Sequence, residues 1–210
     1  MKNAPLVSTE ASRNYAKPIL WLVPAAIATT AVVTYDVPFL NPAHRSRPFF
    51  FSIRFMLIPH ILAAVVAVLV GPFQFSTRLR QRNPRVHRIL GRIYVGAVGV
   101  AALMAFLMGP TQPPGFRNFG DTLAALWVVC TLAAILTARN RQFTQHRIWA
   151  IRSYGVAFIF FFDRLPLGFD FRDTTNFVSY VYIPMIAVLV VPDVVSHWPA
   201  LTTKRVVATR

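Results

Sequence analysis

Two short stretches of the sequence combine histidine, arginine and tyrosine at the start of an apolar segment. The first is HRILGRIY, residues 87–94, and the second is HRIWAIRSY, residues 146–154, which begins 59 residues later. An imidazole nitrogen can bind a metal, including a haem iron, whereas a guanidinium group binds carboxylates and phosphates. These residue types at this spacing therefore indicate either a cofactor site or a site for anionic groups.

The two stretches match each other along most of their length, and each follows a basic loop. The matched pairs are His87 with His146, Arg88 with Arg147, Arg92 with Arg152 and Tyr94 with Tyr154, the last two pairs after one inserted residue. We interpret the match as an internal repeat, which in a membrane protein can build a site at the interface of its two halves. The alternative is convergent use of the same side chains at the membrane interface.

A haem b site is the most specific interpretation of the repeat. His87 and His146 would supply two axial ligands from facing helices, between which a helix bundle can hold a porphyrin. The remaining matched side chains would bind the propionates or complete the site, namely Arg88, Arg92, Arg147, Arg152, Tyr94 and Tyr154. This hypothesis predicts a membrane electron-transfer protein that has a redox partner.

The same cluster also fits interpretations without iron. Histidine, arginine and tyrosine place apolar bodies in the bilayer and polar tips among the headgroups, so the cluster can be purely interfacial. Alternatively, the arginines would bind an anionic lipid headgroup or a quinone headgroup. The sequence leaves these alternatives open, because all of them need polar tips at the same depth.

His60 and Arg54 support a separate hypothesis, a small transporter. His60 lies near the middle of an apolar segment and follows Pro59. An ionisable residue inside a membrane span is costly and indicates function by default, although a neutral histidine bonded to a neighbouring helix is the simpler explanation. Arg54 lies nearer the end of the same segment and can extend to the interface.

The composition indicates a helical membrane protein and no nucleic-acid partner. Of the 210 residues, 55% are hydrophobic and 14% charged, and the mean hydropathy is +0.50. The period-two alternation of a β-barrel is absent. Cys130 is the single cysteine, and the sequence has no motif for nucleotide, zinc or serine chemistry. The question of enzymatic activity therefore stays open. Haem is the one cofactor that the residues suggest.

Six apolar segments are long enough to span a bilayer. The predicted spans are 18–40, 49–75, 88–109, 120–138, 147–168 and 177–198 of a single domain, residues 1–210. Spans two to five form a predicted four-helix core of two related hairpins. Residues 1–17 and 199–210 are predicted as tails.

The distribution of charge predicts the topology. With the amino terminus in the cytoplasm, 16 of the 22 basic residues fall on the inner side, which is the positive-inside pattern. Both tails are then cytoplasmic. The net charge of +15 is explained by this topology together with contact with anionic lipid headgroups.

Longer motifs around the repeat resemble a family of bacterial membrane proteins known as domain of unknown function 2306. The similar positions are Gly71, Pro72, Gln74 and Phe75, the HR-x-x-GR-x-Y box, the QHR-x-W-x-IRSY box beginning at Gln145, and Arg164. The resemblance covers about residues 55–168 and implies a multi-pass protein of the inner membrane without a known activity. The histidines on spans three and five are also arranged like those of the ascorbate-linked transmembrane cytochromes b, an analogy of topology alone.

Overall fold

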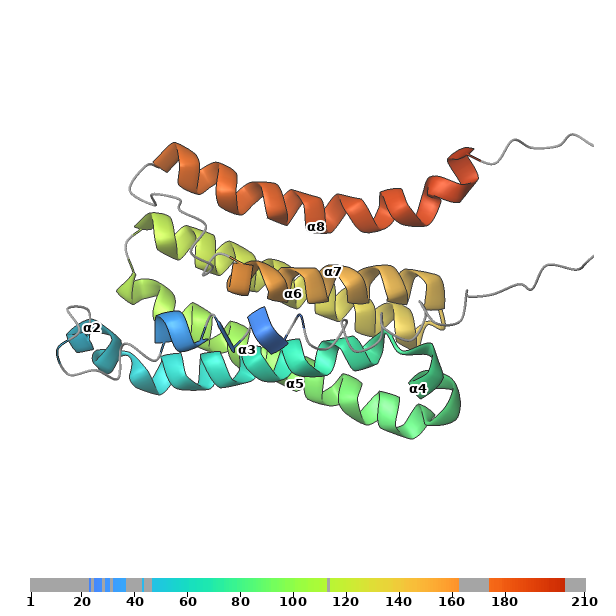
Figure 1. Cartoon of the computed structure of the whole chain (residues 1–210), viewed down its shortest axis with the longest axis horizontal. Helices are drawn as coiled ribbons and strands as arrows, with labels where there is room; N and C mark the ends of the chain where they lie inside the picture. The colour runs from blue at the N-terminus through green and yellow to red at the C-terminus, as the bar shows by residue number, and fades with distance from the viewer. Residues whose placement is uncertain are drawn as a thin grey trace, which may run out of the picture.

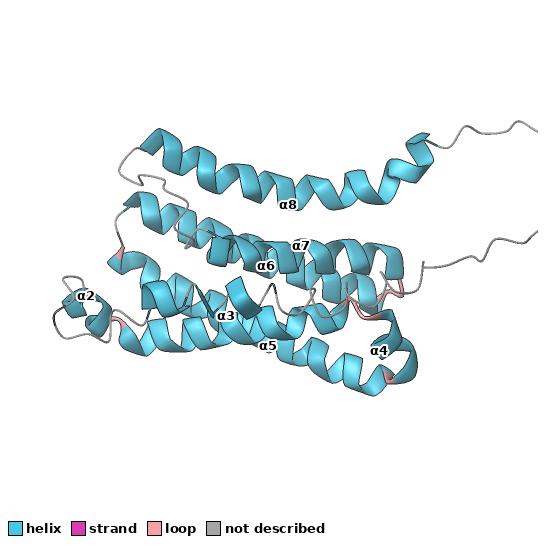
Figure 2. Ribbon diagram, viewed as in Figure 1, coloured by secondary structure: helices cyan, strands magenta, loops and turns pink. Residues whose placement is uncertain are grey.

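The structure, a computed structural model, describes residues 47–112, 114–162 and 174–202, together with Ala43 and shorter stretches between residues 23 and 36. In this part of the chain every regular element is a helix (Figures 1 and 2). The prediction of an all-α fold is therefore confirmed. The elements in chain order are η1 (Val32–Asp36), α2 (Arg47–Ser52), α3 (Arg54–Gln74), α4 (Thr77–Arg82), α5 (Pro84–Met108), η3 (Gly109–Thr111), α6 (Pro114–Arg139), α7 (Phe143–Phe162) and α8 (Thr174–Thr202).

Four helices form the core. Helices α3 and α5 pack as one hairpin and α6 and α7 as a second, while α5 packs on α6 and α3 on α7. The four helices thus surround a common axis in the order α3, α5, α6, α7, with α5 and α7 on a diagonal. Helix α8 lies along the outside and packs on α7 (Figure 1).

Within the described residues, three helical segments are long and apolar enough to cross a membrane, namely Arg54–Gln74, Pro84–Thr111 and Arg117–Arg139. The outer face of α3 carries large exposed apolar side chains at helical spacing, Phe55, Ile58, Leu62, Val66 and Leu69. Such a face suits contact with lipid, because exposed apolar side chains are stable against hydrocarbon and not against water. The prediction of six spans stays a prediction, since its first span (18–40) lies mostly outside the described residues and the described parts of α7 and α8 do not meet this criterion of length and hydropathy. Residues 1–17 and 203–210 also lie outside the described residues, whereas residues 199–202, predicted as part of a tail, belong to α8.

Small residues allow α3 and α5 to approach each other closely. Ala64 and Ala67 of α3 and Ala97 and Ala101 of α5 are buried in the core. Close packing of small side chains is the usual basis of helix association in lipid. His60 joins the same interface, because its Nδ1 lies 2.8 Å from the carbonyl oxygen of Ala101.

Four helices begin earlier than their apolar runs predict, among them α6 at Pro114 rather than at residue 120 and α8 at Thr174 rather than at residue 177. Helix α5 begins at Pro84 rather than at residue 88, and α7 begins at Phe143 rather than at residue 147. Proline is favoured in the first turn of a helix, where its missing N–H has no helical partner to lose. As a result, His87 and His146 lie inside their helices, where a side chain can face the bundle.

Candidate functional site

The four core helices line a cavity. Its lining residues lie near the ends of these helices that α4 and the α6–α7 turn connect, and Figure 1 shows these two connections at one end of the bundle. The volume of the cavity is about 520 Å³, within the roughly 300–1,000 Å³ of typical small-molecule sites. Each core helix contributes to the lining, for example Gln74 of α3, His87 of α5, Arg139 of α6 and His146 of α7. The described lining holds three arginines and two histidines and no acidic residue, so the cavity favours an anionic ligand.

The cavity brings together both histidines of the repeated stretches. His87 and His146 line it from α5 and α7, the two helices on the diagonal of the core. Tyr94 and Tyr154, which also match each other in the repeat, line it as well. Two of the four pairs that the sequence matches by position therefore meet at one site.

A hydrogen bond to the backbone fixes the tautomer of His146. Its Nδ1 lies 2.8 Å from the carbonyl oxygen of Ala134 on α6. A carbonyl can only accept, so Nδ1 carries the hydrogen. In the neutral ring Nε2 then keeps its lone pair, which is the arrangement that metal-binding histidines use.

His87 lacks the corresponding bond. Its Nδ1 is buried and has no hydrogen-bond partner within the described residues. His146 bonds the carbonyl of the residue 12 positions earlier, and the residue 12 positions before His87 is Phe75, the cap at which α3 ends. Helix α6, in contrast, continues past Ala134 to Arg139. The two hairpins therefore differ at this point, and His87 is left with polar capacity for a ligand.

Of the four predicted arginines, two line the cavity and two do not. Arg88 and Arg92 belong to the lining, together with Arg139. Arg147 is exposed at the same end of the bundle. Arg152 points to α8, where its Nε donates to the carbonyl of Leu189 at 3.0 Å and its Nη2 bonds the carboxylate of Asp193.

Four side chains close a hydrogen-bonded ring at the inner end of the cavity. Thr131 donates its single hydroxyl hydrogen to the carbonyl of Trp127 at 2.7 Å. The 2.7 Å contact between Thr131 and Ser153 is then a bond that Ser153 donates. Tyr94 in turn donates to Ser153 at 2.9 Å and accepts from the indole N–H of Trp127 at 3.4 Å. The ring begins and ends at Trp127, and every hydroxyl hydrogen in it is used.

Tyr154 crosses to α3 and covers a glycine there. Its hydroxyl donates to the carbonyl of Val68 at 3.0 Å. A Cβ atom at Gly71 would lie 2.1 Å from the tyrosine ring, so only glycine leaves room for the ring. The ring also makes edge-to-face contacts with Phe75 and Phe158. Tyr154 thereby joins the two hairpins beside the cavity.

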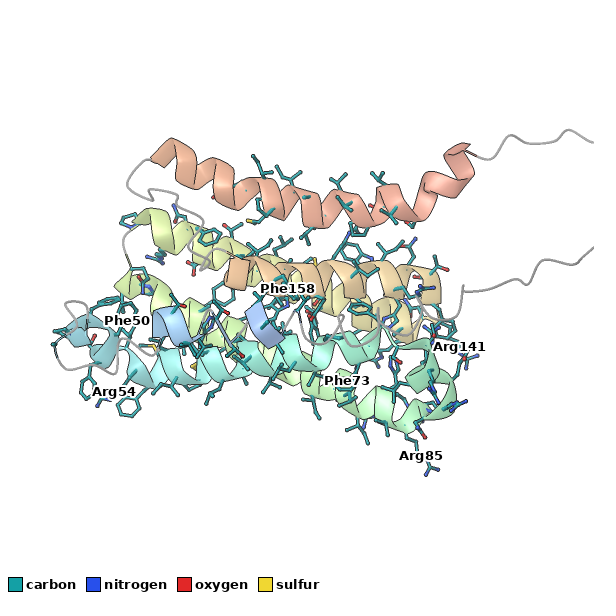
Figure 3. All side chains as sticks on the ribbon, in the orientation of Figure 1. Phe50, Arg54, Phe73, Arg85, Arg141 and Phe158 are labelled. Atoms are coloured by element: carbon teal, nitrogen blue, oxygen red, sulfur yellow. The ribbon has the colours of Figure 1, made fainter. Side chains whose placement is uncertain are left out.

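His60 and Arg54 lie away from this site. His60 is buried between α3 and α5 and bonds the backbone, as described above. Arg54 is the first residue of α3, at the opposite end of the molecule from Arg85 and Arg141 (Figure 3). Its guanidinium bonds the carbonyl of Phe51 at 2.6 Å and stacks on Phe51 and Phe55. The contacts at Arg54 are those of an interfacial side chain.

The sequence analysis did not assign several cavity residues to the site. On α6 these are Thr131, Ala134, Ile135, Ala138 and Arg139. Their spacing of three and four residues is that of one helix face. Apart from Ile135 this face is small or polar, whereas the exposed Leu132 and Leu136 lie on other faces. Gln74 belongs to a family motif but carried no role in the prediction.

Fold and site together define an all-α membrane protein with a cationic cavity at the basic end of a four-helix core. The model of the family described as "Predicted membrane protein (DUF2306)" matches residues 57–198. The chain therefore belongs to this family, and the resemblance found in its motifs is confirmed. No curated protein and no solved structure matches the chain.

Proposed function

We propose that the chain binds one haem b in the cavity through His87 and His146 and serves as a membrane electron-transfer protein. The observation that carries the proposal is that two histidines on diagonal helices line one cavity of about 520 Å³. Bound haem would supply one-electron exchange between its ferric and ferrous states.

The nitrogen atoms of both histidines support this assignment. His146 donates from Nδ1 to the backbone, which leaves Nε2 for an axial bond and orients the ring. His87 has a buried Nδ1 without a partner in the described chain, which is a polar group that a ligand would satisfy. Among the described residues no group of three or more metal-binding side chains occurs, and two histidines would be enough to hold a haem iron.

The rest of the lining suits the two parts of a haem. Apolar side chains such as Phe75, Val95 and Ile135 would contact the porphyrin ring. Arg88, Arg92 and Arg139 would pair with the propionates through charge-assisted hydrogen bonds.

We infer that the end of the bundle that holds the cavity faces the cytoplasm of a bacterial cell, with the protein in the inner membrane. Nine exposed arginines at this end of the described chain support this topology, namely Arg78, Arg80, Arg82, Arg85, Arg88, Arg92, Arg139, Arg141 and Arg147. The sequence has no acidic residue between Asp36 and Asp121 or between Asp121 and Asp163. Anionic headgroups of the inner leaflet would balance this charge.

An absorption spectrum of the purified protein tests the proposal. After expression with added haem precursor, we expect a Soret band and the sharp visible bands of a reduced low-spin b-type haem. The double variant His87→Ala, His146→Ala should lose these bands, whereas His60→Gln, which changes a buried histidine outside the cavity, should keep them. A wild-type protein without a Soret band, or a double variant with an unchanged spectrum, would refute haem binding.

An anionic lipid is a second candidate ligand, because the described lining is cationic and apolar and contains no acid. In this case Arg88, Arg92 and Arg139 would hold a phosphate. Native mass spectrometry should then detect retained phosphatidylglycerol in preference to phosphatidylcholine, and equal retention of the two lipids would exclude this candidate.

A further inference from the structure

The inner end of the cavity offers hydrogen-bond acceptors but no free hydroxyl hydrogens. Tyr94, Thr131 and Ser153 line the cavity, and the ring that they form with Trp127 uses the hydrogen of each hydroxyl. Ser153 is only 1% exposed, so water does not compete for its bonds. A carboxylate or phosphate needs donors and would find none here.

Gln74 on α3, in contrast to these hydroxyls, has a hydrogen-bond donor that is not used. Its Nε2 is buried in the cavity lining and has no hydrogen-bond partner among the described residues. A buried amide nitrogen without a partner destabilises the folded state, and such a group in a native cavity requires an explanation. A ligand oxygen that accepts from Nε2 is the explanation that the cavity provides.

Gly91 fixes the position of the Gln74 amide. A Cβ atom at Gly91 would lie 3.2 Å from Oε1 of Gln74, so the amide rests directly on the glycine. Gly91 follows His87 by four residues, and positions four apart share one face of a helix. Gln74 and His87, whose Nδ1 also lacks a partner, therefore face the cavity from the same side.

The arginines of the lining complete this group of donors. Arg88, Arg92 and Arg139 belong to the lining, and the described lining has no acidic side chain to neutralise them. Guanidinium and amide donors acting together bind carboxylate and phosphate oxygens more strongly than either does alone.

We propose that Gln74, with Arg88, Arg92 and Arg139, forms an oxyanion subsite that binds a carboxylate or phosphate group of the ligand. The subsite also orients the ligand, because its anionic end must lie at Gln74 and the arginines while its apolar part lies toward the ring of hydroxyls. This assignment rests on the proposed function in so far as the cavity holds a ligand, but it holds equally for a haem propionate and a lipid phosphate.

Substitution of Gln74 in the full-length protein tests the subsite. Gln74→Met keeps the length of the side chain and removes the donors, and Gln74→Glu keeps the shape and replaces them with a negative charge. Gln81→Met on α4, a helix without buried residues, is the matched control. The probes are haem b, its dimethyl ester without free carboxylates, and nanodiscs of phosphatidylcholine with or without phosphatidylglycerol. Circular dichroism and gel filtration verify that each variant is folded.

We expect Gln74→Met to weaken haem binding about tenfold, the loss of one charge-assisted hydrogen bond, and Gln74→Glu to weaken it at least as much. Binding of the ester should change less than twofold, which identifies the propionate as the bound group. If Gln74→Met weakens haem and ester equally, the amide does not bind an anion and the proposal is overturned.

The measurements with phosphatidylglycerol nanodiscs distinguish a wrong subsite from a wrong haem hypothesis. If the wild-type protein binds no haem, the proposed function fails and phosphatidylglycerol becomes the deciding probe. A preference for this lipid that Gln74→Met removes then supports the subsite with a phosphate as its ligand. Binding of both haem and phosphatidylglycerol within twofold of wild type in Gln74→Met overturns it.

Discussion

The hydroxyl of Tyr154 donates to the carbonyl of Val68 at 3.0 Å, and this carbonyl is the one that Pro72 leaves without a helical partner. In an α-helix the N–H of residue 72 would bond the carbonyl of residue 68, and proline has no N–H. A tyrosine from the other hairpin therefore satisfies a backbone group that a proline inside α3 has released. The bond stabilises both the helix and the contact between hairpins.

The other tyrosine of the repeat makes a reciprocal contact. Tyr94, on the second helix of the first hairpin, accepts a hydrogen bond from Trp127, on the first helix of the second hairpin. Tyr154, on the second hairpin, donates its hydrogen bond to Val68 of the first hairpin. Val68 and Trp127 are 59 positions apart, the same offset that separates His87 from His146. The contacts thus support the interpretation of two related hairpins.

Tyr154→Phe should destabilise the protein by about 0.5–2 kcal/mol, the range for hydrogen bonds between membrane helices. The midpoint of thermal unfolding in detergent should fall by a few degrees. Tyr182→Phe on α8 is the control, because Tyr182 is exposed, and it should have almost no effect.

A double-mutant cycle with Pro72→Ala identifies the mechanism. Alanine restores the N–H at position 72, so α3 itself can bond the carbonyl of Val68. Tyr154→Phe should then cost less in the Pro72→Ala background than in wild type. Equal costs in the two backgrounds would show that the bond from Tyr154 does not compensate for the proline.

The helices could be predicted from the sequence, but their ends could not. A membrane helix needs about 20 apolar residues, and this requirement located α3, α5 and α6 with the start of α3 five residues too early and the start of α6 six residues too late. The first turns of α5 (PRVH) and α7 (FTQH) each hold one large apolar residue among polar residues or proline, so the apolar run did not include them. For the same reason the histidines were predicted at the edge of their spans, although they lie one turn inside the helices.

The convergence of His87 and His146 was predictable from the repeat, whereas the direction of Arg152 was not. Arg92 follows His87 by five residues, but Arg152 follows His146 by six. One residue turns a helical position by about 100°, so the inserted residue rotates Arg152 from the cavity toward α8. Its partner Asp193 lies 41 positions away on a different helix, a contact that requires knowledge of the packing.

The turn between α6 and α7 contains a backbone conformation that favours glycine. Arg141 has a φ of 59°, and the bonds from Gln142 to Thr137 and from Arg141 to Ala138 close the α6 terminus. This pattern is the Schellman motif, in which glycine is usual at the position of Arg141. Arg141→Gly should stabilise the protein by about 1 kcal/mol, measured as a higher unfolding midpoint. Asn140→Gly, one position earlier, should lower it, and a decrease for Arg141→Gly would contradict this account.

The hydrogen-bonded ring that includes Trp127 predicts that position 131 prefers serine to valine, although valine is closer to threonine in volume. Thr131→Ser keeps the hydroxyl, whereas Thr131→Val keeps the volume and adds apolar surface. The valine variant would leave Ser153 without the acceptor that lies 2.7 Å away, at a cost of about 1–3 kcal/mol. We expect Thr131→Val to unfold at a lower temperature than Thr131→Ser. A valine variant as stable as the serine variant would show that the ring contributes little.

Substitutions of Arg152 and of Arg92 should have different effects, the first on the stability of the protein and the second on its affinity for haem. The side chain of Arg152 is 11% exposed and that of Asp193 is 48% exposed, so the pair is partly screened and should contribute about 1 kcal/mol. Arg152→Gln should therefore lower the unfolding midpoint slightly and leave haem affinity within twofold of wild type. Arg92→Gln should do the reverse, weakening haem about tenfold by loss of a charged contact with little change in stability.

Asp193→Asn provides the matched test of the α7–α8 contact. It removes the charge opposite Arg152 but leaves the bond from Arg152 to the carbonyl of Leu189. If the ion pair is the source of stabilisation, Asp193→Asn and Arg152→Gln should have similar effects, and the double variant should be no less stable than either single one. Additive losses would mean that the two residues act independently. A tenfold loss of haem affinity in Arg152→Gln would instead assign Arg152 to the cavity, because no contact with α8 explains such a loss.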